Sequence, residues 1–183
     1  TTDTNLFARV ARGFRAPSIQ GRILFEPAFV SVADSETIMS YEAGIKTGFL
    51  DDRARLSFTV FTFDLEDQQL TVVGGQSNFN QLVNADKTKG QGFELDLDAY
   101  LTDRLLVTLG VSYNDTEIDD PNLAIAACAA CTVLDPEGEV EGTYSIDGNS
   151  LPQAPEWIAN ATLRYGVPVG DGELFFYTDW AYR

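Results

Sequence analysis

Histidine is absent from the 183 residues, and only two cysteines and one methionine are present. Without histidine, the chain lacks the side chain that most often transfers protons near neutral pH and most often binds metals. A Ser-His-Asp catalytic site is excluded for the same reason. No stretch is both uncharged and apolar over the roughly 18 residues that a membrane-spanning helix needs, since the longest uncharged one, residues 68–85, contains seven Gln and Asn residues. We therefore predict neither an enzyme nor a helical membrane protein.

Positive charge is also scarce. Twelve Lys and Arg residues stand against 28 Asp and Glu residues, giving a formal net charge of −16. No basic stripe is present to neutralise phosphates, which argues against nucleic acid as a partner. The charge is unevenly placed, because residues 115–147 hold nine acids and no Lys or Arg. Residues 4–25 show the reverse pattern, with four arginines and no acid: Arg9, Arg12, Arg15 and Arg22.

The two cysteines, Cys128 and Cys131, lie close together in a Cys-Ala-Ala-Cys segment. One pair without histidine cannot complete a four-ligand zinc site, so no metal site is predicted. A redox motif would be expected near a βαβ pattern, which the sequence lacks. A short-range disulfide formed in an oxidising compartment is the favoured interpretation. Two free thiols are the alternative.

The dominant pattern of the sequence is an alternation of apolar and polar residues with period two, which predicts β-strands. In residues 41–49, apolar or small side chains alternate with Glu42, Lys46 and two glycines. The run from residue 53 is less regular, because Phe61 and Phe63 interrupt its polar side. We expect seven strands, at residues 4–12, 36–49, 53–72, 79–101 with a possible break near 85, 104–117, 155–166 and 173–183.

The expected connections differ in length between the two ends of the strands. Short turns fall at residues 50–52, 101–103 and 167–172, whereas residues 13–35 and 116–153 form long connections. A tight turn near residues 74–78 joins two unusually long strands. This arrangement is typical of an up-and-down antiparallel meander with unequal ends.

The length of the strands favours a transmembrane β-barrel over a soluble sandwich. Several alternations last about 10 residues, as membrane strands require, whereas soluble strands average about 5–6. In lipid all backbone groups must be paired, so the strands must close into a barrel. We expect an all-β, antiparallel up-and-down barrel, present here as a partial arc of about seven strands. Its lumen-facing charged residues are predicted to be Glu42, Lys46, Glu94, Asp96 and Asp98. A soluble antiparallel sandwich is the alternative, but it explains the strand lengths and unequal loops less well.

Four segments resemble, in this order, successive barrel segments of the TonB-dependent outer-membrane receptors. They are LFARVARGFRAPS (6–18), SYEAGIKTGFLDDRARLSFTVFTFDLEDQQ (40–69), NADKTKGQGFELDLDAYLTDRL (84–105) and GNSLPQAPEWIANATLRY (148–165). The resemblance implies a barrel of about 22 strands in the bacterial outer membrane. It also implies an N-terminal plug domain with a segment that contacts TonB. Neither is present here, and the chain begins without Met and ends within a strand-like run. We therefore expect residues 1–183 to be a middle-to-late part of the barrel domain.

The resemblance implies active uptake of a scarce, bulky nutrient, with a ferric siderophore complex as the default substrate. The implied partners are outer-membrane lipid, lipopolysaccharide, TonB through the missing N-terminal part, and a small-molecule ligand. No cofactor is expected, and iron would enter only as part of the transported chelate. A passive porin or structural barrel is the alternative, and a secreted β-rich binding module is a third interpretation.

The arginines of residues 4–25 are the first candidates for ligand binding. By strand alternation Arg9 points to the lumen, and Arg12 and Arg15 lie at the top of the first strand and its loop, with Arg22 further on. Guanidinium groups there could bind an anionic iron chelate. Alternatively, they pair with lumen acids or with lipopolysaccharide phosphates.

Two groups of carboxylates have both a functional and a structural interpretation. The acidic segment 115–147 could bind Ca²⁺, but it lacks the spacing of a dedicated calcium loop, and a solvated, mobile surface loop is expected instead. A glycosidase uses paired acids, and this is the functional interpretation of Glu94, Asp96 and Asp98. Lining of a wet lumen is the simpler interpretation for neighbours on one strand.

Overall fold

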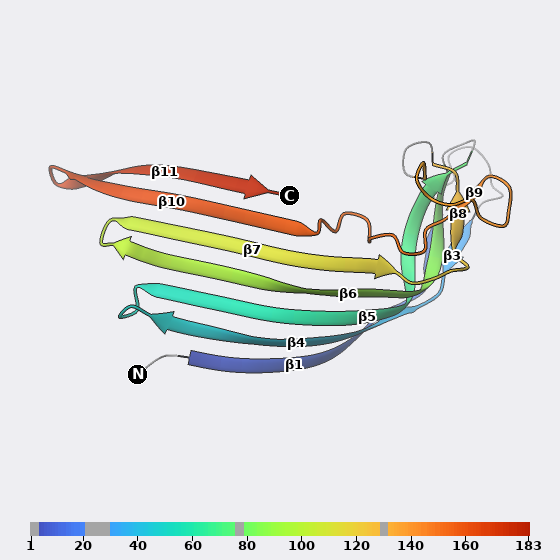
Figure 1. Cartoon of the computed structure of the whole chain (residues 1–183), viewed down its shortest axis with the longest axis horizontal. Coiled ribbons are helices and arrows are strands. Elements are labelled where there is room, and N and C mark those ends of the chain that lie inside the picture. Colours follow the sequence, from blue (N-terminus) through green and yellow to red (C-terminus); the bar gives the residue numbers. More distant parts are fainter. Residues whose placement is uncertain (1–3, 21–29, 76–78, 129–131) are drawn as a thin grey trace.

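The computed structural model describes residues 4–20, 30–75, 79–128 and 132–183. One antiparallel sheet of seven strands dominates it, and each strand of this sheet pairs with its neighbours in chain order (Figure 1). The strands are β1 (Thr4–Arg15), β4 (Glu36–Phe49), β5 (Ala54–Gly74), β6 (Phe79–Thr102), β7 (Leu105–Ile118), β10 (Trp157–Val169) and β11 (Gly172–Tyr182). The sheet is an open arc whose two edges are β1 and β11. In the described ranges, no helix is long and apolar enough to cross a membrane.

The seven expected strands are all present, with shifted ends. β1 continues to Arg15 rather than ending at residue 12, and β6 runs without a break through residue 85. The long connections contain four further strands of three residues each, which are too short to show a period in the sequence. These are β2 (Ser18–Gln20) paired with β3 (Ser31–Ala33), and β8 (Ala124–Ala126) paired with β9 (Thr143–Ser145).

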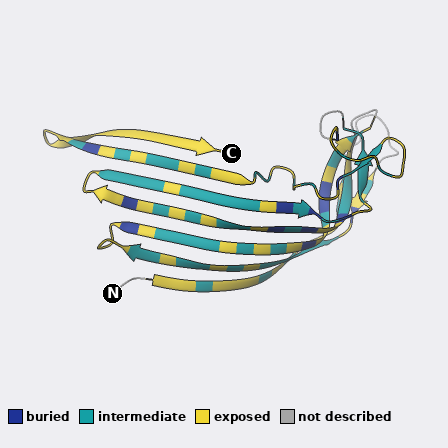
Figure 2. Ribbon diagram, viewed as in Figure 1, coloured by how far each residue is buried: buried dark blue, intermediate teal, exposed yellow. Residues whose placement is uncertain are grey.

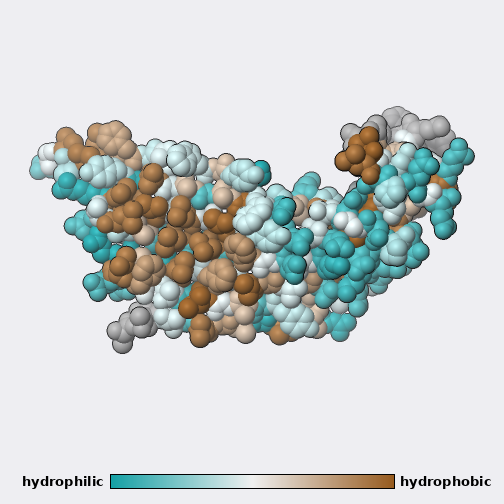
Figure 3. All heavy atoms as spheres, viewed as in Figure 1, coloured by the Kyte–Doolittle hydropathy of each residue, from teal (hydrophilic) through white to brown (hydrophobic). Residues whose placement is uncertain are grey.

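The register places most of the apolar residues of the seven strands on one face, because directly opposed residues point to the same side of a sheet. Ile45 opposes both Leu6 and Phe58, and Phe58 in turn opposes Leu95. We call this surface the apolar belt; it covers the half of the sheet near the short turns (Figure 3). Its principal residues are Leu6, Val10, Tyr41, Ile45, Phe49, Leu56, Phe58, Val60, Phe93, Leu95, Leu97, Leu105, Val107, Leu109, Val111, Tyr113, Trp157, Leu163, Tyr165, Leu174, Phe176, Trp180 and Tyr182.

The height of the apolar belt matches the hydrocarbon layer of an outer membrane. Tyr41 and Phe49 lie at its two borders and are eight residues apart on β4. At about 3.3 Å per residue they are about 26 Å apart along the strand. A strand tilt of about 40° reduces this to a height of about 20 Å, close to the roughly 25 Å apolar band of outer-membrane barrels.

The upper border of the apolar belt is marked by a cluster of aromatic rings. The ring centroids of Tyr113 and Trp157 are 4.8 Å apart, and Phe93 lies 6.0 Å from each of them. Aromatic rings gather at this depth in membrane barrels because their amphipathic edges suit the lipid interface. The apolar belt and its aromatic border therefore indicate which part of the seven-stranded sheet crosses the bilayer.

We call the opposite side of the sheet the polar face. Packing between β5 and β6 on this face explains why the alternation after residue 53 is irregular. The ring of Phe61 lies over Gly92 on β6, 2.8 Å from where a Cβ atom would stand, and Phe63 lies over Gly90 in the same way. Each glycine leaves room for an aromatic ring from the neighbouring strand, and the two rings stack at 6.4 Å. The Gly-Gln-Gly segment thus serves packing between strands.

A buried apolar cluster lies at the long-loop end of the sheet, beyond the belt (Figure 2). Leu70, Ala85, Ile118 and Ile146 are each less than a tenth exposed and pack together. Backbone hydrogen bonds attach the loop to the strand tips, including one of 2.9 Å from Gly75 N to the Ala127 carbonyl. The described part of the 116–153 connection is therefore folded against β5 and β6, with residues such as Leu134, 94 % exposed, at its surface. Its mobility stays a prediction.

Candidate functional site

Charged side chains cross the polar face in two rows near the short turns. Lys46 on β4 and Asp96 on β6 both oppose Ser57 on β5. One row closer to the turns, Arg55 on β5 directly opposes Asp98 on β6. Because residues two apart on a strand share a face, each row presents its side chains to the same space above the sheet.

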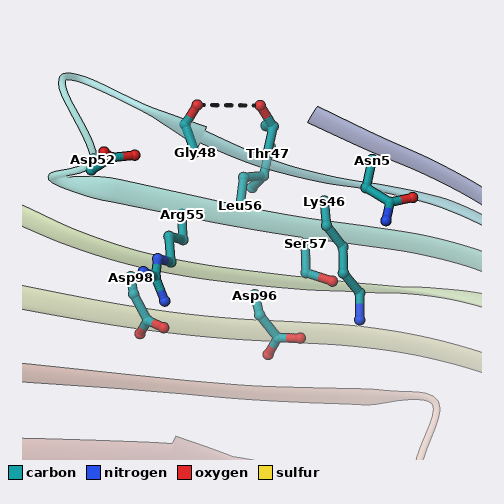
Figure 4. Close-up of a pocket in the computed structure, with 10 residues that line it drawn as sticks. All are labelled: Asn5, Lys46, Thr47, Gly48, Asp52, Arg55, Leu56, Ser57, Asp96 and Asp98. Carbon is teal, nitrogen blue, oxygen red and sulfur yellow. Dashed lines mark hydrogen bonds between the residues drawn. The ribbon is translucent and has the colours of Figure 1, made fainter. Parts of the chain in front are cut away.

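These rows line an open hollow of about 420 Å³. Figure 4 shows Lys46 and Arg55 extending in the direction of β6, the strand that carries Asp96 and Asp98. Asp52 approaches the same hollow from the β4–β5 turn. The full lining consists of Asn5, Lys46, Thr47, Gly48, Asp52, Arg55, Leu56, Ser57, Asp96 and Asp98.

The cations and carboxylates of this hollow are not paired with one another. The ion pairs that the described residues form include none of Lys46, Arg55, Asp96 and Asp98. Lys46 instead places its Nζ 5.6 Å from the ring centroid of Phe7. The hollow therefore offers charges of both signs to water or to a polar partner surface.

The remaining predicted lumen-facing residues also lie on the polar face. Glu42 on β4 accepts a 2.8 Å hydrogen bond from Nη2 of Arg9 on β1. Glu94 lines a second, smaller hollow next to Asp96, with Ser112 on its wall. All five predicted residues therefore share one side of the sheet, and their exposure to a lumen stays a prediction.

The structure separates the four arginines that the sequence groups together. Arg9 and Arg15 lie on the polar face, and Arg15 approaches Glu36 to 3.5 Å. Arg12 lies on the opposite face, beside Val10, because β1 is still a strand at this point. Arg22 lies outside the described residues. Within the described part, the arginines therefore do not form a single cluster, and their role in ligand binding stays untested.

The acidic connection is held together by backbone hydrogen bonds. Asp120 is 4 % exposed, and its two carboxylate oxygens accept bonds from Asp86 N at 2.9 Å and Asn122 N at 3.1 Å. Such bonds satisfy a buried carboxylate without a cation. Among the described residues, no group of three His, Cys, Asp or Glu could hold a metal ion. Cys131 lies outside the described residues, so its disulfide with Cys128 stays a prediction.

A buried amide attaches the first long connection to β5, which the sequence did not indicate. Gln69 Nε2 donates to the carbonyls of Ala16 and Asp34, each at 2.8 Å, and its Oε1 accepts a bond from the Ser18 hydroxyl. Its backbone N–H donates to Glu36 at 2.7 Å. Because these partners are far apart in sequence, no local pattern could have revealed the network.

A band of ion pairs follows the apolar belt on the same side of the sheet, towards the long loops. Lys87 approaches Asp64 to 3.1 Å, and Lys89 approaches Glu117 to 3.2 Å and Asp119 to 3.6 Å. The hydrogen bond to Glu117 raises the pKa of Lys89 above its ordinary value. This change from apolar to charged residues marks the upper limit of the membrane-spanning part of β5 to β7.

Comparison with known proteins gives a match over residues 1–183 to the family model described as TonB dependent receptor-like, beta-barrel. The metal-pseudopaline receptor CntO of Pseudomonas aeruginosa is 30 % identical over 93 % of this chain. The probable TonB-dependent siderophore receptor PiuA of Acinetobacter baumannii is 26 % identical over 78 %. The ferric yersiniabactin uptake receptor FyuA of Yersinia pestis has the same fold, with a TM-score of 0.65 at 18 % identity over 94 % of this chain and 22 % of FyuA.

The chain covers 23 % of CntO and 18 % of PiuA, and so spans about a fifth of the length of these curated relatives. The family consists of outer-membrane barrels that act in transport and not as enzymes. Its membrane location agrees with the apolar belt, and its barrel fold agrees with the open antiparallel arc. The chain therefore belongs to the TonB-dependent receptor β-barrel family and forms part of such a barrel in the outer membrane.

Proposed function

We propose that the protein containing this chain takes up a metal chelate of the siderophore type across the outer membrane, using energy delivered through TonB. The observation that carries the proposal is the family match over every residue of the chain. The printed names of CntO and PiuA, a metal-pseudopaline receptor and a probable siderophore receptor, support this class of substrate. Contact with TonB would be made by the N-terminal part of the receptor.

Within this proposal the polar face lines the barrel interior. The unpaired charges around Lys46 and Asp96 would contact water or the domain that fills the barrel. They lie near the short turns, which face the periplasm in outer-membrane barrels. The transported chelate would first meet the opposite end, where the folded 116–153 connection holds eight of the 28 Asp and Glu residues and no Lys or Arg.

Uptake of iron-55 bound to candidate siderophores tests the proposal in cells that express the full receptor. We expect accumulation above that of a receptor-deletion strain for at least one chelate, and its loss when TonB is deleted. Accumulation that persists without TonB would indicate a passive porin, the alternative function. Failure to accumulate any of a panel of catecholate, hydroxamate and carboxylate chelates would contradict the siderophore class.

A further inference from the structure

Arg12 points to the membrane side of the sheet, away from the polar face. It opposes Met39 on β4, in register with the apolar belt, whereas Arg9 opposes Glu42 on the other face. On β1 its neighbours on the same side are Val10 and Phe14, which are 64 % and 72 % exposed. An anionic ligand inside the barrel could not reach a guanidinium on this side.

The surroundings of Arg12 are those of the boundary between lipid tails and headgroups. Arg12 lies one step beyond Val10 towards the long loops, and its cross-strand neighbours Met39 and Tyr41 carry no charge. An arginine in such a place lays its aliphatic stem along apolar surface while its charged end reaches the headgroup layer. The long-loop end of a barrel faces the cell exterior, so this is the outer leaflet.

Within the described part of the chain, Arg12 also differs from the other cations of its surroundings in its lack of a carboxylate partner. Arg9 and Arg15 on the other face are each paired with a glutamate, and Lys87 and Lys89 approach carboxylates on the membrane side. Among the described residues, Arg12 has no acidic partner within 4.0 Å. An exposed guanidinium without a carboxylate partner is suited to bind a phosphate in a bidentate manner.

We propose that Arg12 binds a phosphate group of lipopolysaccharide in the outer leaflet. This role differs from ligand binding and does not depend on which chelate the receptor transports. Phosphate binding explains why an arginine lies between Val10 and Phe14 on the apolar side of β1. The adjacent Phe14 ring would lie against the same lipid, because both side chains project from one face of the strand.

Thermal unfolding of the full receptor in vesicles tests this site. The vesicles contain phosphatidylcholine alone, or phosphatidylcholine with about 10 mol% of either lipopolysaccharide or dephosphorylated lipopolysaccharide. We expect lipopolysaccharide to raise the Tm of the unmodified receptor and the dephosphorylated form to raise it clearly less. In Arg12→Gln the increment should fall by about half or more, because the guanidinium that holds the phosphate is gone.

Arg9→Gln is the matched control, since Arg9 lies on the same strand but on the polar face. It should keep the full increment, and Arg12→Lys should keep most of it, because a cation remains. Heat-dependent gel migration confirms that each variant is folded. The proposal is overturned if Arg12→Gln keeps the full increment, if Arg9→Gln loses as much, or if dephosphorylated lipopolysaccharide stabilises the receptor equally well.

Discussion

The ring of Phe7 on β1 lies directly over Gly44 on β4. The two residues oppose each other in the register, and a Cβ atom on Gly44 would stand 2.6 Å from Phe7 Cζ and 2.6 Å from the Phe58 carbonyl oxygen. Phe7 in turn lies beneath Lys46 on the polar face. Glycine at this position therefore lets an aromatic ring close over the backbone next to Lys46, which lines the charged hollow.

Gly44→Ala should destabilise the receptor by about 1–3 kcal/mol, because the added methyl group overpacks against Phe7 and backbone. Gly48→Ala on the same strand is the matched control. There the new Cβ would stand 3.4 Å from its closest neighbour, Asp52 Oδ1, and the cost should stay within about 0.5 kcal/mol. Urea unfolding in lipid vesicles measures both. Equal effects of the two variants would mean that the Phe7–Gly44 contact is not tight.

Leu109→Arg should cost about 2–4 kcal/mol, because Leu109 lies in the middle of the apolar belt, where a charge would enter hydrocarbon. Ser112→Arg lies three residues further along β7 on the polar face, beside Glu94, and should be nearly neutral. The free energy of unfolding in vesicles checks the pair. If the serine variant were the more destabilised one, the assignment of the two faces would be reversed.

Gln69→Leu should loosen the first long connection, because it removes the hydrogen bonds of the Gln69 amide to the Ala16 carbonyl, the Asp34 carbonyl and the Ser18 hydroxyl. Each lost hydrogen bond of this kind costs about 0.5–1.5 kcal/mol. Hydrogen exchange of the β2 and β3 amides should accelerate about tenfold or more.

Gln68→Leu is the control, because it removes a glutamine at the preceding position of β5. The Oε1 atom of Gln68 is buried without a partner, so its removal should leave stability unchanged or slightly higher. Unchanged exchange in the Gln69 variant would show that the amide does not hold β2 and β3 in place.

Arg9→Gln should lower the free energy of unfolding by less than about 1 kcal/mol, although it breaks a 2.8 Å ion pair with Glu42. The two side chains are 62 % and 27 % exposed, so solvent screens their attraction. The difference between variant and unmodified receptor should shrink further in about 1 M NaCl. A loss above about 2 kcal/mol that resists salt would mean that Glu42 is buried against another part of the full receptor.

The seven long strands and the charged polar face could be predicted because both follow from local alternation. A period of two over nine or more residues, as in 41–49 and 105–113, determines the face of each side chain once the strand exists. The same rule correctly places Glu94, Asp96 and Asp98 together. The Phe61 and Phe63 exceptions needed the partner strand, since only the register brings Gly92 and Gly90 beneath them.

The long connections could not be predicted, because their order depends on contacts between distant residues. Ile118 and Ile146 become buried only when they meet Leu70 and Ala85, and the three-residue strands have no period of their own. The arginines show a related limit. Placing the end of the first strand at residue 12 left Arg12 at the top of that strand and Arg15 in the loop beyond it, whereas three further residues of pairing put them on opposite faces.

The most direct test of the account is a scan of lipid contact along residues 105–113 of β7 in the full receptor. Single cysteines, introduced after Cys128 and Cys131 are replaced by serine, would carry a fluorophore that brominated lipid or an aqueous reagent can quench. The account predicts strong quenching by brominated lipid at Val107, Leu109 and Val111, which lie in the apolar belt. It predicts weak lipid quenching at the polar-face positions Thr108 and Ser112. Uniform quenching by the aqueous reagent, without this alternation, would contradict a membrane-spanning strand.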